Sequence, residues 1–144
     1  MPGESEPVDI VLLDSCIVID YTKGVEEIKK QVSKVRMPCI NFVVEMELMQ
    51  GARDKRELTK IRKELGSFYL LAFRNEIARL SSQLLKDYFL SHHLQIADAI
   101  IAATSLVYSI PLFTHNKKDF RYIPNLDIYE IAIPRQSEPE NILK

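Results

Sequence analysis

The sequence predicts an α/β domain, a three-layer α/β/α sandwich with a mostly parallel sheet. Short apolar runs rich in Val, Ile and Leu alternate along the chain with longer segments whose apolar residues recur at helical spacing. Strands that alternate with helices form parallel sheets covered by helices on both faces. The first run, VDIVLL at residues 8–13, is almost continuously apolar, which indicates a strand buried on both faces.

Strands and helices can be assigned along the whole chain from these patterns. Five strands are expected, at residues 8–13, 37–40, 67–73, 111–113 and 126–131. Six helices are expected between them, at residues 16–22, 25–32, 42–50, 54–64, 76–90 and 96–108. Asn41 and Asn75 can cap two of these helices, and Gly51 can end one. His92 and His93 are expected in a loop.

Length and composition suit one globular domain. The chain has 144 residues, of which 47% are hydrophobic and 27% charged. Its net charge of −1 is unlike that of a dedicated duplex-DNA-binding protein, although acids gathered at a metal site would offset a basic surface elsewhere. Residues 1–7 are expected to be a flexible N-terminal segment and residues 134–144 a loose tail, with the domain at residues 8–133.

The sequence shows no recognisable secretory or membrane signal, and its cysteines look like reduced thiols, so a cytoplasmic location is predicted. No apolar run approaches the length of a membrane span, and the acidic, polar start does not resemble a secretory signal. A cytoplasmic protein with no membrane partner is therefore expected. Cys16 and Cys39 lie in apolar stretches and are expected to be buried, reduced thiols.

Acidic and small polar side chains follow the expected strands. In parallel sheets ligands bind beyond the carboxyl ends of the strands, so these residues are expected to gather there. They are Asp14 and Ser15 after the first strand, Glu45 and Glu47 after the second, and Thr114, Asn116 and Asp119 after the fourth. Asp14 can equally serve as a helix cap. Glu45 and Glu47 point about 200° apart on a helix, so at most one faces the site.

Asp98 is the most informative of the acids. It lies in the first turn of a helix that is apolar on nearly every side, and a buried carboxylate is costly unless it is paired or bound to metal. Carboxylates without histidine or thiolate suit hard cations, Mg²⁺ or Mn²⁺. His92 and His93 are adjacent and need not converge on a metal, so a solvated loop is the better interpretation for them.

Four stretches of the sequence resemble the PIN-domain family, particularly its VapC-type toxins. They occur in the family's order and cover the chain from about residue 8 to residue 131. They are LLDS at residues 12–15, ELMQGA at 47–52, DAIIAAT at 98–104 and PLFTHNKKDF at 111–120. The last two together are the most specific.

The resemblance implies a PIN-like fold and a metal-dependent ribonuclease that cuts single-stranded RNA with Mg²⁺ or Mn²⁺. It also implies a small antitoxin protein as partner and a homodimer. By position in the motifs, the metal-binding catalytic acids are Asp14, Glu47 and Asp98, with Asp119 as the fourth. The supporting polar residues are Ser15, Thr114 and Asn116, and the candidate RNA contacts are Lys117, Lys118 and Arg121. The alignment on Gly51 selects Glu47 rather than Glu45.

The sequence departs from the family pattern in two places and leaves some alternatives open. Ser15 replaces the commoner Thr, and Val44 stands where Thr or Ser often precedes the glutamate. A receiver-type signalling domain is a poor fit, because Leu-Ala-Phe at residues 71–73 occupies the end of the third strand where that class needs an Asp. An RNA-processing nuclease outside a toxin–antitoxin pair and a catalytically silent PIN-fold binding module remain open. So does the choice between Asn116 and Asp119 to complete the site.

Overall fold

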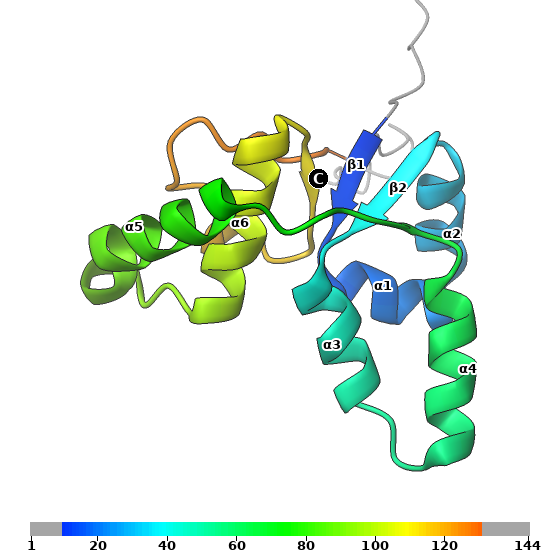
Figure 1. Cartoon of the computed structure of the whole chain (residues 1–144). Helices are drawn as coiled ribbons and strands as arrows, with labels where there is room; N and C mark the ends of the chain where they lie inside the picture. Colours follow the sequence, from blue (N-terminus) through cyan, green and yellow to red (C-terminus); the bar gives the residue numbers. More distant parts are fainter. Residues whose placement is uncertain (1–9, 131–144) are drawn as a thin grey trace, which may run out of the picture.

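The computed structural model describes residues 10–130, and its helices and strands alternate as expected. Along the chain they are β1 (Ile10–Leu13), α1 (Ser15–Thr22), α2 (Glu26–Ser33), β2 (Met37–Ile40), α3 (Phe42–Gln50), α4 (Lys55–Leu65), β3 (Tyr69–Leu70), α5 (Asn75–His92), α6 (Ile96–Tyr108), β4 (Leu112–Phe113) and the 3-10 turn η1 (Lys117–Asp119) (Figure 1). The N-terminal segment and C-terminal tail expected from the sequence lie outside the described residues.

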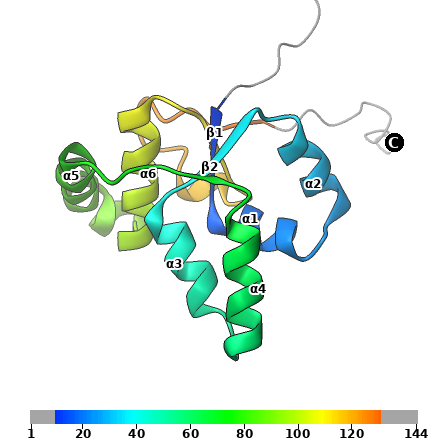
Figure 2. The ribbon, with the colours of Figure 1, turned by 45° about the vertical axis from the view of Figure 1, so that its right-hand side comes forward.

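The sheet has four strands in the order β3-β2-β1-β4, and every pair is parallel. Helices α5 and α6 lie on one side of β1 and β2, and α2 lies on the other (Figure 2). The predicted α/β/α arrangement with a parallel sheet is therefore confirmed. The order of the strands reverses direction between β1 and β4, so the ends of these two strands form the topological switch point of the sheet.

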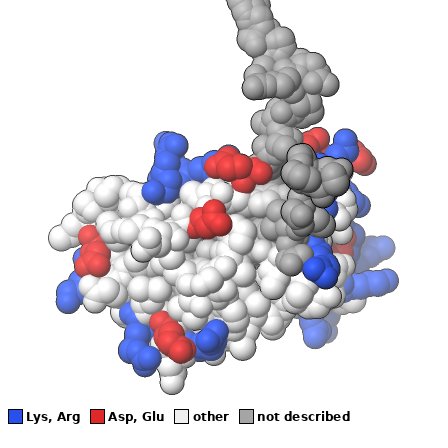
Figure 3. Space-filling model, turned by 90° about the horizontal axis from the view of Figure 1, so that it is seen from above, with Lys and Arg blue, Asp and Glu red and all other residues white. Residues whose placement is uncertain are grey.

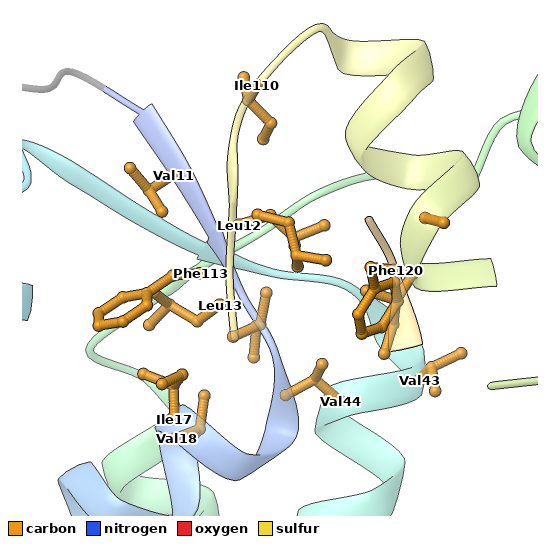
Figure 4. Packing of buried hydrophobic residues seen from close by; sticks show 14 of the residues in the cluster. Val11, Leu12, Leu13, Ile17, Val18, Val43, Val44, Ile110, Phe113 and Phe120 are labelled. Carbon is orange, nitrogen blue, oxygen red and sulfur yellow. The ribbon is translucent and has the colours of Figure 1, made fainter. Parts of the chain in front are cut away.

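The central strands are buried on both faces, as their continuous apolar sequence predicts. Val11, Leu12 and Leu13 of β1 are fully buried, and Phe113 of β4 is 1% exposed. These side chains pack against residues from α1, α3 and the segment after β4 in one continuous core (Figure 4). Because β1 and β4 are buried on both faces, their ends are held rigidly, and the candidate site lies at those ends.

Two of the five expected strands differ from the prediction. The stretch expected as a strand at residues 126–131 forms only an isolated parallel bridge, between Ile128 and Leu112, within the part that the structure describes. The strand expected at residues 67–73 shrinks to Tyr69 and Leu70, both about half exposed. It lies at the edge of the sheet, where its apolar residues gain little burial from a longer pairing.

Helix ends follow the expected capping chemistry in most places. Asn41 caps α3 by accepting a 3.0 Å hydrogen bond from the Val44 backbone N–H. Asn75 was expected as a cap, but it is the first residue of α5, and Arg74 precedes it without a capping side-chain bond. His92 was expected in a loop, but it is the last residue of α5. No helix within residues 10–130 is long and apolar enough to cross a membrane.

Candidate active site

The candidate site lies at the switch point between the ends of β1 and β4. The Asp14 backbone N–H donates a 2.9 Å hydrogen bond to the Phe113 carbonyl, which holds the two strand ends together. The residues that follow, Asp14 and Thr114, are 4% and 2% exposed. The sheet therefore brings a carboxylate and a hydroxyl together although they are 100 positions apart in sequence.

Both oxygens of the Asp14 carboxylate are fixed by hydrogen bonds. Oδ1 accepts a 2.8 Å bond from the Ser15 backbone N–H, and Oδ2 accepts a 2.7 Å bond from the Thr114 hydroxyl. The Thr114 hydroxyl oxygen in turn accepts the Asn116 backbone N–H at 3.0 Å. Asp14 thus caps α1 and also faces Thr114, so the two roles considered for it are compatible.

Cys16 also contacts the Asp14 carboxylate, which the sequence did not indicate. Its Sγ lies 3.6 Å from Asp14 Oδ2 and accepts the His115 backbone N–H at 3.5 Å. Burial, and then the charge of Asp14, raise the pKa of the Cys16 thiol. The thiol therefore stays protonated and donates to the carboxylate. Only its place two residues after Asp14, at the start of a helix, could have suggested this contact.

Asp98 is the acid most strongly perturbed by its surroundings. It lies in the first turn of α6 and is half-buried. Burial, and then the negative charges of Asp14, Asp119 and Glu47, together raise the pKa of its carboxyl to about 6. Three acids from three other segments are therefore near enough to Asp98 to repel its ionised form. These are the residues that the sequence selected.

Glu47, and not Glu45, is turned toward this group. Glu47 is exposed and borders a shallow depression with Ser15 and Ile19 of α1. Glu45 borders a separate pocket with Arg62 of α4 and the end of β2. The two glutamates of α3 thus point to different surfaces, as their spacing on a helix requires.

The segment after β4 carries Asn116, which directly precedes the turn η1, and Asp119, which is the last residue of that turn. Both are exposed, and the Asp119 backbone N–H donates to the Asn116 carbonyl at 2.9 Å. Phe120 is fully buried and lies on the same side of the core as Val43 and Val44 of α3 (Figure 4). This buried ring anchors the turn and so limits where Asp119 can move.

The three basic candidates for RNA contact differ in their partners. Lys117 forms an ion pair with Glu130 at 2.6 Å. Lys118 and Arg121 are exposed and have no ion pair within residues 10–130. In α4 and the loop before it, Arg53 pairs with Glu57, and Lys60 pairs with Glu64. Arg53 and Lys60 thus each have an acidic partner four residues further along the chain.

The side chains fit a hard cation by their chemistry more than by their present placement. All the acidic donors are carboxylates, which suits Mg²⁺ or Mn²⁺, and their mutual repulsion at Asp98 is of the kind that a cation relieves. As they stand, however, no three Asp, Glu, His or Cys side chains in the described part of the chain are close enough to hold an ion. Where the described residues are visible at the opposite end of the sheet, acidic side chains lie in small separate groups (Figure 3).

Known proteins resemble this chain over most of its length. Ribonuclease VapC of Rickettsia bellii (strain RML369-C) is 28% identical over 131 residues, which cover 85% of this chain and 97% of that protein. Ribonuclease VapC1 of Methanocaldococcus jannaschii is 28% identical over 128 residues, which cover 83% of this chain and 87% of that protein.

Solved structures have the same fold. A chain in a toxin–antitoxin complex from Klebsiella pneumoniae matches with a TM-score of 0.69 and 32% identity, covering 84% of this chain and 99% of that one. A chain in the VapBC-1 structure from nontypeable Haemophilus influenzae matches with a TM-score of 0.71 and 22% identity, covering 84% of this chain and 97% of that one. The PIN domain model matches residues 11–126, and the chain therefore belongs to the PIN domain family.

Proposed function

We propose that this protein is a metal-dependent endoribonuclease that cuts single-stranded RNA in the cytoplasm and acts as the toxin of a toxin–antitoxin pair. One observation carries the proposal. Burial, and then the charges of Asp14, Asp119 and Glu47 from three other segments, raise the pKa of Asp98 to about 6 at the end of the sheet. The relatives named Ribonuclease VapC support the choice of RNA as substrate.

We assign the ion to the four acids. Asp14 and Asp98 would bind Mg²⁺ or Mn²⁺ directly, Glu47 directly or through water, and Asp119 would complete the set. Such an ion supplies positive charge for a phosphodiester under attack by water. Thr114 holds one oxygen of Asp14 and Ser15 the other, so this carboxylate is pre-oriented before the ion arrives. The other acids need to move toward it.

Substrate binding requires positive charge beside these acids. Lys118 and Arg121 flank Asp119 on the segment after β4 and are exposed. We propose that they contact RNA phosphates, because free cations next to a phosphodiester site provide most of the attraction for a nucleic acid. Lys117, which pairs with Glu130, would contribute only if RNA displaces that partner.

Cleavage of a short single-stranded RNA tests the nuclease assignment. The purified protein should cut it with Mg²⁺ or Mn²⁺, and EDTA should stop the reaction. Asp98→Asn should lower the rate by orders of magnitude with the circular dichroism spectrum unchanged, while Glu45→Gln on α3 serves as the matched acidic control and should cut normally. Unchanged cleavage by Asp98→Asn would refute the site.

Expression in a bacterial host tests the toxin role. The wild type should arrest growth, and Asp14→Asn should not. A nuclease that cuts RNA in vitro but leaves growth unaffected would instead favour a role in RNA processing. Arrest by both proteins would point away from nuclease toxicity altogether.

We further propose an antitoxin that inhibits through the acids. A relative with 32% identity was solved in a toxin–antitoxin complex. An arginine from such a partner would pair with the carboxylates in place of the ion. The affinity of the antitoxin for this protein should therefore fall as Mn²⁺ is added. An affinity that does not change with Mn²⁺ would show that inhibition works elsewhere.

A further inference from the structure

Three aromatic rings gather at the end of α5, next to the candidate site. Tyr88 and His92 lie one turn apart on that helix, and Tyr122 comes from the segment after η1. The His92 and Tyr122 rings are stacked, with centroids 3.9 Å apart and planes 12° apart. Tyr88 meets both rings at steep angles, with centroids 5.1 Å from Tyr122 and 5.8 Å from His92. The stack is therefore held in place from the side.

The outer ring of this stack is open to solvent. His92 is exposed, whereas Tyr88 and Tyr122 are partly buried. Tyr122 covers one face of His92 and Tyr88 meets the imidazole at a steep angle, and no third ring lies against it among residues 10–130. Its Nδ1 forms a 2.8 Å hydrogen bond with the neighbouring Ser91 hydroxyl, which fixes the ring's orientation. A flat, oriented and half-covered aromatic surface is thus presented to the solvent.

The chain's connections place this surface beside the acids. Tyr122 follows Asp119 by three residues, and Phe120 between them is fully buried. His92 ends α5, and the short connection at residues 93–95 leads directly to α6, where Asp98 lies in the first turn. The charges of Asp98 and Asp119 both reach the Tyr122 phenol and, after burial, raise its pKa. Arg121, exposed, lies between Tyr122 and the turn.

We propose that His92 and Tyr122 form a stacking subsite for one base of a single-stranded RNA, flanking the phosphate that is cut. Nucleobases stack on aromatic side chains without regard to sequence, which suits a substrate whose backbone is held by cations. The outer face of His92 receives the base, and Tyr122 and Tyr88 support it from behind. The inference rests on the proposed ribonuclease function.

Binding of a fluorescent single-stranded RNA in EDTA tests the subsite, because no cleavage occurs there. His92→Ala should weaken binding roughly tenfold, as expected for one lost base stack. His92→Phe keeps a flat ring and should bind like the wild type. Tyr69→Ala, which removes an exposed aromatic ring on β3, is the matched control and should have no effect. Thermal unfolding should show that each variant remains folded.

An RNA that lacks a single base distinguishes stacking from phosphate contact. Moving the abasic position along the RNA should reveal one position where the wild type loses affinity and His92→Ala loses nothing more. The salt dependence of binding should be unchanged by His92→Ala and reduced by Arg121→Ala.

The outcomes separate this subsite from the nuclease proposal. If wild type and His92→Ala bind RNA equally, the subsite is refuted and the nuclease is untouched. If the wild type binds no single-stranded RNA, both are refuted. If binding falls with His92→Ala but the wild type cuts RNA with neither Mg²⁺ nor Mn²⁺, the nuclease proposal fails and His92 and Tyr122 form only a base-binding site.

Discussion

At the scale of single residues, the ionised carboxylate of Asp98 lowers the free energy of unfolding, because it is partly buried among other negative charges. Burial, and then the charges of three neighbouring acids, raise the pKa of its carboxyl to about 6. In the unfolded chain the pKa of the same carboxyl lies near its ordinary value of 3.8. Between these two pH values the folded protein binds the Asp98 proton more tightly than the unfolded chain does. In metal-free protein the free energy of unfolding should therefore fall as the pH rises from about 4 to about 6.

Asp98→Asn should remove the loss of unfolding free energy that the ionised carboxylate causes. In EDTA at pH 7 we expect the variant to be more stable than the wild type by roughly 1 kcal/mol, because the carboxylate is partly solvated and screening limits the penalty. Urea unfolding at pH 4 and pH 7 measures the difference, which should vanish at the lower pH. Mn²⁺ should stabilise the wild type more than the variant. A variant less stable than the wild type at pH 7 would contradict the assignment of Asp98 as a repelled charge.

We expect Asp119, rather than Asn116, to complete the site. The charge of Asp119 acts on Asp98, whereas Asn116 contacts the site through its backbone, which bonds to the Thr114 hydroxyl and the Asp119 N–H. Asp119→Asn should raise the Mn²⁺ concentration needed for half-maximal cleavage roughly tenfold or more. Asp14→Asn should abolish cleavage at every Mn²⁺ concentration. Asn116→Ala is the control and should titrate like the wild type.

The buried ring next to Asp119 offers a second test. Phe120 anchors the turn, so loosening it should mimic Asp119→Asn. Phe120→Ala would cost about 3–5 kcal/mol of stability, so the milder Phe120→Leu is the better variant. If Asp119→Asn cleaves like the wild type throughout the Mn²⁺ titration, Asp119 is a surface residue and Asn116 becomes the candidate.

At the scale of secondary-structure elements, one buried amide links two of the helices that carry acids. The Asn41 carboxamide oxygen caps α3, which holds Glu47. Its Nδ2 donates a 3.2 Å bond to the Thr104 hydroxyl on α6, which holds Asp98. Both polar side chains are almost fully buried, at 2% and 1% exposed. The bond therefore sets how α3 sits against α6 and, through them, how the two acids face each other.

Asn41→Ala should destabilise the fold by about 1–2 kcal/mol, because it removes a helix cap and leaves buried groups without partners. Asn41→Asp keeps the cap oxygen but loses the donor to Thr104, so it should be less stable than the wild type and its cleavage should respond more weakly to metal. Denaturant unfolding measures the first effect and a Mn²⁺ titration of cleavage the second. A wild-type titration for Asn41→Asp would show that the link does not position the acids.

The elements also show what the sequence could and could not predict. Buried strands and capped helices were predictable, because continuous apolar runs and residues such as Asn41 act locally. The strand expected at 126–131 was not, because its pairing depends on how the chain returns past β4, which leaves only the bridge at Ile128. The acids could be found from their places after strands. The contact of His92 with Tyr122 could not, because it joins two segments whose spacing carries no signal.

At the scale of the whole molecule, the site lies at one end of the sheet, and a mainly apolar groove lies between α5 and α6. The strand order reverses between β1 and β4, which are neighbours in the sheet. Asp14 follows β1 and Thr114 follows β4, so the order of the strands places these two residues side by side. Residues of both helices line this groove. It is bordered by Phe73, Ala78, Ser81, Ser82, Leu85, Ile96, Ala99 and Ile100.

We expect this groove to be the interface of a homodimer, the oligomer expected from the sequence. Phe73 and Ile96 at this groove are 51% and 68% exposed. Exposed apolar side chains grouped in this way favour association, and a twofold axis lets one surface serve both subunits. Light scattering at micromolar concentration should give twice the mass of the chain.

Ile96→Glu should convert that dimer to a monomer, because each subunit would place a charge in the groove of the other. Its side chain is already largely exposed, so the fold should survive, as the circular dichroism spectrum can check. Val25→Glu, at the start of α2 on the other side of the sheet, replaces a 40% exposed residue and should leave the dimer intact. A wild type that scatters as a clean monomer would refute the dimer. A wild type and an Ile96→Glu variant that are both dimeric would place the interface elsewhere on the molecule.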